Sequence, residues 1–316
     1  MRDMNIYKEQ IITELRGKVG GKKVLLALSG GVDCSVCAAL LSQAGADLTC
    51  IFVDHGCMRK NEAAEVKAAF ADRDLKLVQI DAADRFLEKL AGVTEPEQKR
   101  KLIGAEFIRV FEEEARKIGA VDFLAQGTIY PDVIESDEKI KSHHNVGGLP
   151  DCVDFKEIVE PVRELYKNEV RELGRLLGLP ECITERQPFP GPGLAIRVIG
   201  EVTRGKLDIL READFIFRDE VKNAGLDKNL DQYFAALTDM RAVGVRDGKR
   251  TYGYVAALRA VKTVDFMTAE FARVPYEVLE KAAARITGIV GGEGSDGISR
   301  VLFDVTDKPP GTVEFE

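Results

Sequence analysis

The chain has 316 residues, with 45 Lys and Arg against 53 Asp and Glu, and a formal net charge of −8. This length favours two domains, and the acidic balance argues against a broad nucleic-acid-binding surface. No apolar run approaches the roughly 20 residues that span a membrane, and the polar amphipathic N-terminal helix has no signal-peptide core. Six cysteines without metal-ligand spacing are expected to be reduced, which predicts a cytoplasmic protein.

The first predicted strand, Val24 to Leu28, is short, continuous and apolar, as strands buried on both faces of a parallel sheet are. The helical spacing of Val36, Ala39 and Leu40 predicts a helix after it. Ser29 to Asp33 therefore forms a strand-to-helix turn. Its two glycines let backbone N–H groups approach an anion, and the helix N-terminus adds positive potential.

The polar side chains of this turn favour a phosphate ligand with a metal ion. Ser29 and Ser35 add hydroxyl donors. Asp33 would repel a bound anion unless a cation lay between them, and Mg²⁺ bridging a carboxylate and a phosphate resolves this conflict. The turn has neither the Walker-type G-x-x-x-x-G-K-[ST] motif nor G-x-G-x-x-G, so both of those nucleotide-binding loops are excluded. An ordinary capped turn is the alternative interpretation.

Strands and helices alternate as far as about residue 186. Further strands are predicted at Leu48–Val53, Leu75–Ala82, Val121–Gln126 and Ile158–Val159, and helices at Glu62–Phe70, Pro96–Gly119 and within 166–179. This alternation predicts a doubly wound, Rossmann-like α/β domain with a five-stranded parallel sheet. Ligands of such sheets bind beyond the carboxyl ends of the strands, where the glycine-rich turn is expected.

A long polar segment, "GTIYPDVIESDEKIKSHHNVGGLP", follows the fourth strand. We predict that residues 127–155 form a lid over the ligand edge, and a solvated surface loop is the alternative. Asp132 and Glu135 come directly after the strand and are expected near the glycine-rich turn. Lys141 and His143 would supply positive donors to phosphates.

Three prolines and two glycines within residues 188–193 interrupt the pattern, so we predict domains of residues 1–186 and 187–316. In the second domain, "LAIRVIGEV" and "YFAALTDMRAVGVRDGKRTYGYVAALRAVKT" predict strands and turns, and "VPYEVLEKAAARITGIV" predicts a helix. The end of the chain, "SRVLFDVTDKPPGTVEFE", predicts two short strands. The second part is therefore expected to be a smaller α+β domain.

The turn sequence S-G-G-V-D-C-S resembles the pyrophosphate loop of the N-type ATP pyrophosphatases, which split ATP into AMP and pyrophosphate. Six further motifs, in order, resemble the GMP synthetase family: "GTIYPDVIES", "KSHHNVGGLP", "LYKNEVRELG", "RQPFPGPGLAIR", "GKRTYGYVAALRAV" and "DKPPGTVEFE". The resemblance runs from about Ile11 to Glu316. It implies an ATP pyrophosphatase domain followed by a dimerisation domain.

The resemblance also implies a reaction. The C2 oxygen of XMP would attack the α-phosphorus of MgATP, giving adenyl-XMP and pyrophosphate, and ammonia would then displace AMP to give GMP. Members of the family carry an N-terminal glutaminase, for which there is no room ahead of Ser29. A glutamine amidotransferase domain or subunit is therefore the expected source of ammonia. A homodimer through the second domain is also implied, with neither membrane nor nucleic acid as a partner.

Individual roles follow from the same resemblance. The residues expected to bind ATP are Ser29, Gly30, Gly31, Val32, Asp33, Cys34, Ser35 and, through its backbone beside adenine, Val53. The residues expected to hold Mg²⁺, organise adenylation or neutralise phosphates are Asp33, Asp132, Glu135, Lys141, His143 and Lys167. The residues expected to contact XMP are Arg100, Gln232, Arg300, Lys308, Thr312 and Glu314.

Two residues depart from the family pattern: Cys34 replaces a serine, and Asn168 replaces the aspartate that follows the lysine. They keep open a catalytically impaired, nucleotide-binding regulatory subunit. The other alternative is a tRNA 2-thiouridylase of the same superfamily, which needs a pair of catalytic cysteines and a basic RNA surface. Neither Cys152 nor Cys182 lies in such a motif, and the charge balance is acidic.

Overall fold

The computed structural model describes residues 2–137, 154–263, 267–289 and 297–316. The chain divides into two compact units. Unit 1 comprises Met1–His55, Asn61–Ala82 and Gly104–Arg186, and unit 2 comprises Gly56–Lys60, Ala83–Ile103 and Gln187–Glu316. Two short segments from the N-terminal half of the sequence therefore belong with the C-terminal half.

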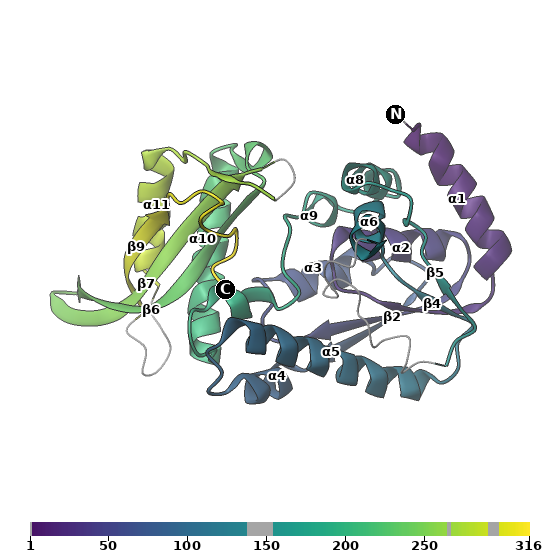
Figure 1. Ribbon diagram of the computed structural model, residues 1–316, viewed down its shortest axis with the longest axis horizontal. Helices are drawn as coiled ribbons and strands as arrows, with labels where there is room; N and C mark the ends of the chain where they lie inside the picture. The colour runs from purple at the N-terminus through teal and green to yellow at the C-terminus, as the bar shows by residue number, and fades with distance from the viewer. Residues whose placement is uncertain (1, 138–153, 264–266, 290–296) are drawn as a thin grey trace. The chain divides into compact units, whose positions relative to one another are not determined.

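Unit 1 is built on a five-stranded sheet with the strand order β3-β2-β1-β4-β5, in which neighbouring strands are parallel (Figure 1). The strands are β1 (Lys23–Ala27), β2 (Asp47–Asp54), β3 (Lys76–Asp81), β4 (Phe123–Ala125) and β5 (Glu157–Val159). Val24, Leu25 and Leu26 of β1 are buried, as the centre of a strand covered on both faces requires. The predicted doubly wound sheet is confirmed.

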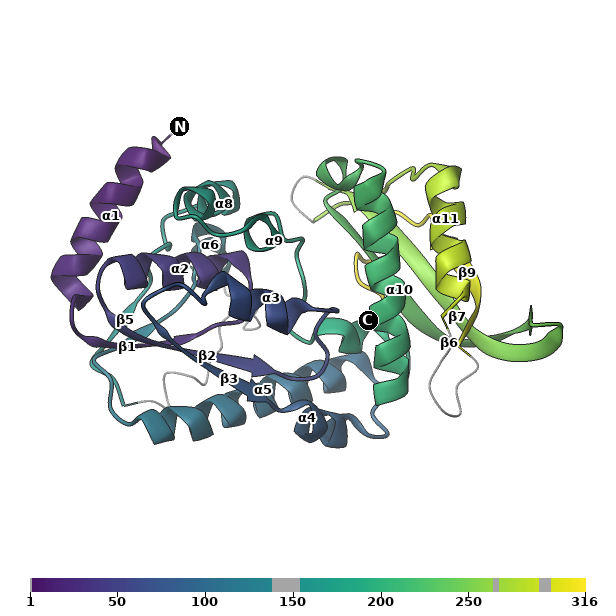
Figure 2. The same ribbon diagram turned by 180° about the vertical axis from the view of Figure 1, so that it is seen from behind.

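Helices cover both faces of this sheet, with α2 and α8 on one side and α5 on the other (Figures 1 and 2). Among the described residues up to 186, the helices are α1 (Met4–Val19), α2 (Val32–Gln43), α3 (Glu62–Ala69), α4 (Ala83–Leu90), α5 (Pro96–Ile118), α6 (Tyr130–Asp137), α8 (Lys167–Leu176) and α9 (Glu181–Thr184). None of the described helices combines the length and the apolarity that a membrane crossing needs.

Unit 2 has a mixed sheet with two helices packed on it. Strands β6 (Gln232–Arg246), β7 (Lys249–Lys262) and β8 (Glu270–Phe271) pair antiparallel, and β9 (Ile298–Asp304) pairs parallel to β7. Helices α10 (Arg204–Asn223) and α11 (Tyr276–Thr287) lie on one face of this sheet (Figure 2). The predicted smaller α+β domain is confirmed.

Two of the segments of unit 2 that were predicted to contain strands differ from the predictions. The segment "LAIRVIGEV" was expected to form a strand, but Gly193–Arg197 form a 3₁₀ helix, η1. The reason is local: Gly193 adopts a φ of +63°, and its N–H bonds to the carbonyl of Pro190, which winds the chain into tight turns. At the end of the chain only β9 is a strand, because the residues after it make a single isolated bridge, Ala269 to Lys308.

Candidate functional site

The glycine-rich turn lies at the carboxyl end of β1 and leads directly into α2. Gly30 has a φ of +76°, and a Cβ added there would lie 2.8 Å from Cγ2 of Val66. Both observations require glycine at this position. Gly31 is the N-cap of α2 and has an extended backbone, with φ −68° and ψ 159°.

The start of α2 offers hydrogen-bond donors to a ligand. Gly31 has no side chain to cap the helix, so the first backbone N–H groups of α2 lack the usual side-chain acceptor. The Gly31 N–H donates to Oγ of Ser29 at 3.3 Å. The hydroxyl of Ser35 is buried and has no hydrogen-bond partner among the described residues. Together with the helix dipole, these groups suit an anion.

Asp33 and Lys167 bring opposite charges to the same turn. Nζ of Lys167, the first residue of α8, lies 2.9 Å from Oδ1 and 2.7 Å from Oδ2 of Asp33. The Lys167 side chain is 45% exposed and the Asp33 side chain 23%, so a ligand can reach both. The described residues contain no preformed cluster of three metal-binding side chains. A single reachable carboxylate nevertheless fits Mg²⁺, which is commonly held by one carboxylate together with phosphate oxygens.

The end of β4 approaches the turn closely. A Cβ on Gly127 would lie 2.9 Å from Sγ and 3.0 Å from the backbone N of Cys34, so this crossing also requires glycine. Burial raises the pKa of the Cys34 thiol, and it raises the pKa of Cys37 further. Cys34 is therefore a neutral thiol and a weak donor rather than a nucleophile.

The remaining residues predicted for this site are only partly described. Val53 is buried near the end of β2. The carboxylate of Asp132 accepts the Ile129 N–H at 2.9 Å and so caps the start of α6. Glu135 belongs to α6. Lys141 and His143, with residues 138–153 of the predicted lid, lie outside the described residues.

A buried ion pair contacts the turn and was not anticipated from the sequence. Nη1 of Arg186 donates to the carbonyl of Gly30, and its Nη2 pairs with Glu62. Arg171 donates to the backbone carbonyls of Arg186 and Thr184, at 2.7 and 2.5 Å. Through these contacts Arg186, the last residue of unit 1, is connected to the glycine turn near the start of the same unit. No motif spacing in the sequence signals such a long-range pair.

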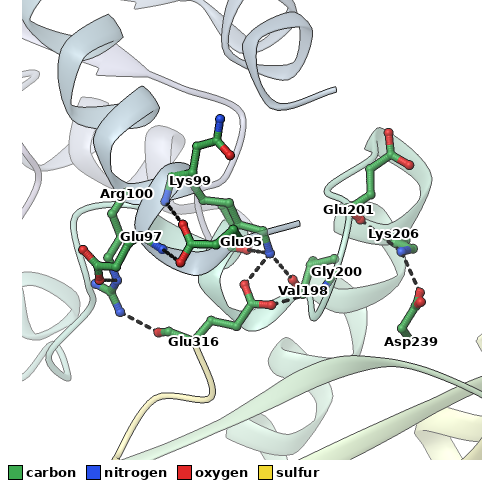
Figure 3. Close-up of polar contacts among 12 residues, drawn as sticks. Glu95, Glu97, Lys99, Arg100, Val198, Gly200, Glu201, Lys206, Asp239 and Glu316 are labelled. Atoms are coloured by element: carbon green, nitrogen blue, oxygen red, sulfur yellow. Dashed lines mark hydrogen bonds and ion pairs between the residues drawn. The ribbon is translucent and has the colours of Figure 1, made fainter. Parts of the chain in front are cut away.

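A second group of charged residues gathers around the end of the chain in unit 2. We call Lys99, Arg100, Arg197, Gln232, Glu314 and Glu316 the tail cluster. The carboxylate of Glu316 accepts hydrogen bonds from Lys99 and from the Gly200 N–H, while Arg100 donates to the Glu316 carbonyl (Figure 3). Lys99 is fully buried, and burial lowers the pKa of its ammonium group.

Glu314 is held by a bidentate ion pair. Arg197 donates from Nε to Oε2 at 2.8 Å and from Nη2 to Oε1 at 2.7 Å, and Nε2 of Gln232 donates to Oε1 at 2.7 Å. Arg197 has no exposed side-chain surface, and its guanidinium lies 4.0 Å from the ring centroid of Phe234. The predicted residues Gln232 and Glu314 therefore touch each other, and Arg100 binds the neighbouring Glu316.

The other residues expected to contact XMP lie along the same tail or on β9. Thr312 donates through its hydroxyl to the Glu314 carbonyl, and its own carbonyl accepts a hydrogen bond from the buried Arg259 at 2.8 Å. Lys308 pairs through its backbone with Ala269, and Arg300 is exposed on β9. Sequence reasoning missed Lys99, Arg197, Arg259 and Glu316. Two of them, Arg197 and Arg259, could have been noticed as single arginines in the otherwise apolar runs "GLAIR" and "AALRAV", because a buried arginine is rare unless it is paired.

Two solved structures align with the chain at low identity. An NMN synthetase from Francisella tularensis aligns with a TM-score of 0.47 and 15% identity, covering 66% of this chain and 85% of that one. An NH₃-dependent NAD synthetase from Campylobacter jejuni aligns with a TM-score of 0.44 and 17% identity, covering 73% and 89%. At these values neither structure adds to the fold, which the strand pairings of the chain itself define.

Sequence comparisons are more specific. The NAD synthase family profile matches residues 6–192, and the GMP synthase C terminal domain profile matches residues 219–315. Proteins named GMP synthase [glutamine-hydrolyzing] from Finegoldia magna and Acetivibrio thermocellus are 63% and 62% identical over 99% of this chain. The chain spans 61% of the length of each of these relatives. The predicted resemblance is confirmed: the chain belongs to the NAD synthase family through residues 6–192, carries a GMP synthase C terminal domain at residues 219–315, and is similar over nearly its whole length to proteins named GMP synthase.

Proposed function

We propose that this chain carries out the synthetase half-reactions of GMP formation: adenylation of XMP by MgATP with release of pyrophosphate, then amination of adenyl-XMP by ammonia. The observation that carries the proposal is identity above 60%, over 99% of the chain, to relatives named GMP synthase. The free donors at the start of α2 support ATP as the ligand of unit 1. A cytoplasmic location fits the five described cysteines, which are unbridged.

In the proposed ATP site, the first N–H groups of α2 and the hydroxyls of Ser29 and Ser35 would hold the β- and γ-phosphates. Asp33 would hold Mg²⁺, which supplies charge neutralisation and Lewis acidity at the phosphates. Lys167 would then exchange its carboxylate partner for a phosphate oxygen. Asp132, Glu135, Lys141 and His143 remain the proposed residues of adenylation and phosphate neutralisation, and Val53 that of adenine contact.

In the proposed XMP site, the tail cluster would bind a purine monophosphate. Glu314 is held in place by its two hydrogen bonds from Arg197, and its carboxylate would accept hydrogen bonds from the N–H groups of a purine base. Gln232 and Thr312 would add neutral polar contacts. The cations Arg100, Arg300 and Lys308 would complement the 5′-phosphate.

The chemistry depends on making a good leaving group. The C2 oxygen of XMP attacks the α-phosphorus of ATP, and the bond from that phosphorus to pyrophosphate breaks. Ammonia then attacks C2, the C2–O bond breaks, AMP leaves and the nitrogen loses a proton. The protein's contribution would be positioning, stabilisation of phosphate charge and exclusion of water. A glutamine amidotransferase domain or subunit would supply the ammonia.

We also propose that the second domain forms a homodimer. Val243, Val245 and Tyr252 are 48%, 77% and 57% exposed on the hairpin of β6 and β7. Val243 and Tyr252 are opposite each other in the strand register, and Val245 is two residues along the same face. Apolar side chains gathered on one exposed face favour a protein contact. Sedimentation of the chain and of the Val245→Glu variant tests this, since the charged variant should be monomeric.

The function itself is tested by measuring pyrophosphate release from MgATP and ammonium, with and without XMP. We expect release only with XMP, together with equal amounts of AMP and GMP. Release that ignores XMP would contradict the proposal, and so would ATP binding with no release. The first result would favour another ATP pyrophosphatase, such as the thiouridylase alternative, and the second would favour the regulatory subunit.

A further inference from the structure

We propose that Arg186 is a positioning residue that fixes the direction of the peptide group between Gly30 and Gly31, and through it the affinity of the turn for ATP. The proposal rests on the proposed function in one respect: it takes ATP as the ligand of this turn. Arg186 is the first residue of the motif "RQPFPGPGLAIR", immediately before the proline- and glycine-rich segment, but no role in the site was predicted for it.

This peptide group needs an external constraint. A planar peptide points its C=O and its N–H in opposite directions, so rotating the Gly30–Gly31 peptide would exchange the two. Glycine on both sides removes the Cβ clashes that usually prevent such a rotation. In the orientation observed, the Gly31 N–H faces the Ser29 hydroxyl at 3.3 Å. The opposite orientation would present a carbonyl oxygen there and repel a phosphate.

Arg186 supplies the constraint. Its Nη1 donates to the Gly30 carbonyl, which holds that oxygen on the side away from the Ser29 hydroxyl. The Arg186 side chain is 11% exposed, and the Glu62 side chain that pairs with it is 4% exposed. A buried guanidinium fork held by a carboxylate has one direction in which to donate. Arg171 donates hydrogen bonds to the backbone carbonyls of Thr184 and Arg186, so the backbone that carries the Arg186 side chain is also held in place.

The same contacts argue that Arg186 acts through the turn rather than on the ligand. Its guanidinium is already engaged by the Gly30 carbonyl and the Glu62 carboxylate. A cation that bound phosphate by charge alone would tolerate replacement by lysine, since lysine keeps the charge. A fork that must contact an ion-pair partner and a carbonyl together would not, because an ammonium group is a point charge without fixed geometry.

The test is calorimetric titration of the full chain with MgATP and, separately, with XMP. We expect Arg186→Met and Arg186→Lys each to weaken ATP binding by about tenfold or more and to leave XMP binding within about twofold. Arg175→Met is the matched control. Arg175 comes from the same part of unit 1, but its guanidinium pairs with the exposed Glu185, so ATP binding should stay unchanged.

Wild-type ATP affinity in either Arg186 variant would overturn the proposal, and equal losses of ATP and XMP binding would show a merely structural role and overturn it too. Arg186→Lys decides the matter if Arg186→Met does not fold. A wild-type chain that binds no MgATP would instead contradict the proposed function. A crystal structure of a variant with weakened binding should show the Gly30–Gly31 peptide rotated.

Discussion

The glycine turn of unit 1 and the tail cluster of unit 2 handle charge in opposite ways. At the turn, the donors are backbone groups, and the Lys167–Asp33 ion pair is 45% and 23% exposed. In the tail cluster, Lys99 and Arg197 have no exposed side-chain surface, and each is paired with a carboxylate of the last three residues. An exposed pair contributes about 0–1 kcal/mol, whereas losing one partner of a buried pair costs about 3–5 kcal/mol.

This difference indicates two ways of preparing for a ligand. The turn can exchange its ion pair for a phosphate at little cost, because water already reaches both side chains. The tail cluster is built before any ligand arrives, and its buried cations fix where the Glu314 carboxylate points. The turn should therefore tolerate loss of its exposed Lys167–Asp33 pair without losing much stability, while unit 2 should unfold more easily without its tail.

The largest effect is expected at the turn. Asp33→Ala should reduce pyrophosphate release by about 1,000-fold or more, because the phosphates lose their metal ligand. The fold should survive, since the pair that is lost is exposed. Turnover rates and melting temperature measured on one preparation check both parts. Glu157→Ala removes another exposed ion pair from unit 1 and serves as the control. Near-normal turnover of Asp33→Ala would refute the assigned role.

Deleting Pro309–Glu316 should come next. XMP affinity should fall by about 100-fold or more, while ATP binding is retained. Unit 2 should also unfold more easily, because Lys99 loses Glu316 and Arg197 loses its bidentate partner Glu314 and keeps only the more distant Asp214. Calorimetry and urea unfolding measure the two effects. The Glu314→Gln variant keeps the whole tail and removes only the charge of the Glu314 carboxylate. Unchanged XMP binding by the deletion variant would contradict the role given to the tail.

A smaller effect is expected for Lys167→Met. Turnover should fall by about tenfold, since one of several phosphate contacts is lost, and the free energy of unfolding should change by less than about 1 kcal/mol. Steady-state kinetics and urea unfolding supply the two numbers. A large decrease in the free energy of unfolding would mean that the turn is stabilised by its ion pair, as the tail cluster is by its buried pairs. The proposed difference between the two regions would then be wrong.

The smallest effect is expected in how the reactivity of the Cys34 thiol depends on pH. Burial raises the pKa of Cys34 above its usual 9.0, so at pH 8 less than about a tenth of it is thiolate. Iodoacetamide should modify the exposed Cys182 first, and the Cys34 rate should still be rising above pH 9. Cys37, which is fully buried, should react only after unfolding. Peptide mass spectrometry between pH 7 and 10 follows each site. Rapid modification of Cys34 at pH 7 would contradict the burial of this thiol.

The sequence predicted the turn far better than the tail cluster, for a physical reason. The turn is made by neighbouring residues, whose apolar run, glycines and helical spacing all act locally, so its position between β1 and α2 was predicted correctly. The tail cluster is made by pairs such as Lys99 with Glu316, which are 217 residues apart. Such pairs leave no local pattern.

The errors have the same origin. The segment "LAIRVIGEV" was predicted to form strands and turns, but the prolines and glycines ahead of it wind its start into η1. Helix α10 was missed, although Thr203 caps it by accepting the Lys206 N–H and Leu207 and Leu210 follow helical spacing. Arg186 escaped notice because its partner Glu62 lies far away in the sequence.

The most direct test of the account is a crystal structure of the chain with MgATP bound. We predict the triphosphate against residues 29–35, with backbone N–H groups of α2 donating to it and Lys167 released from Asp33. A structure with that turn empty and the nucleotide bound elsewhere would contradict the central claim.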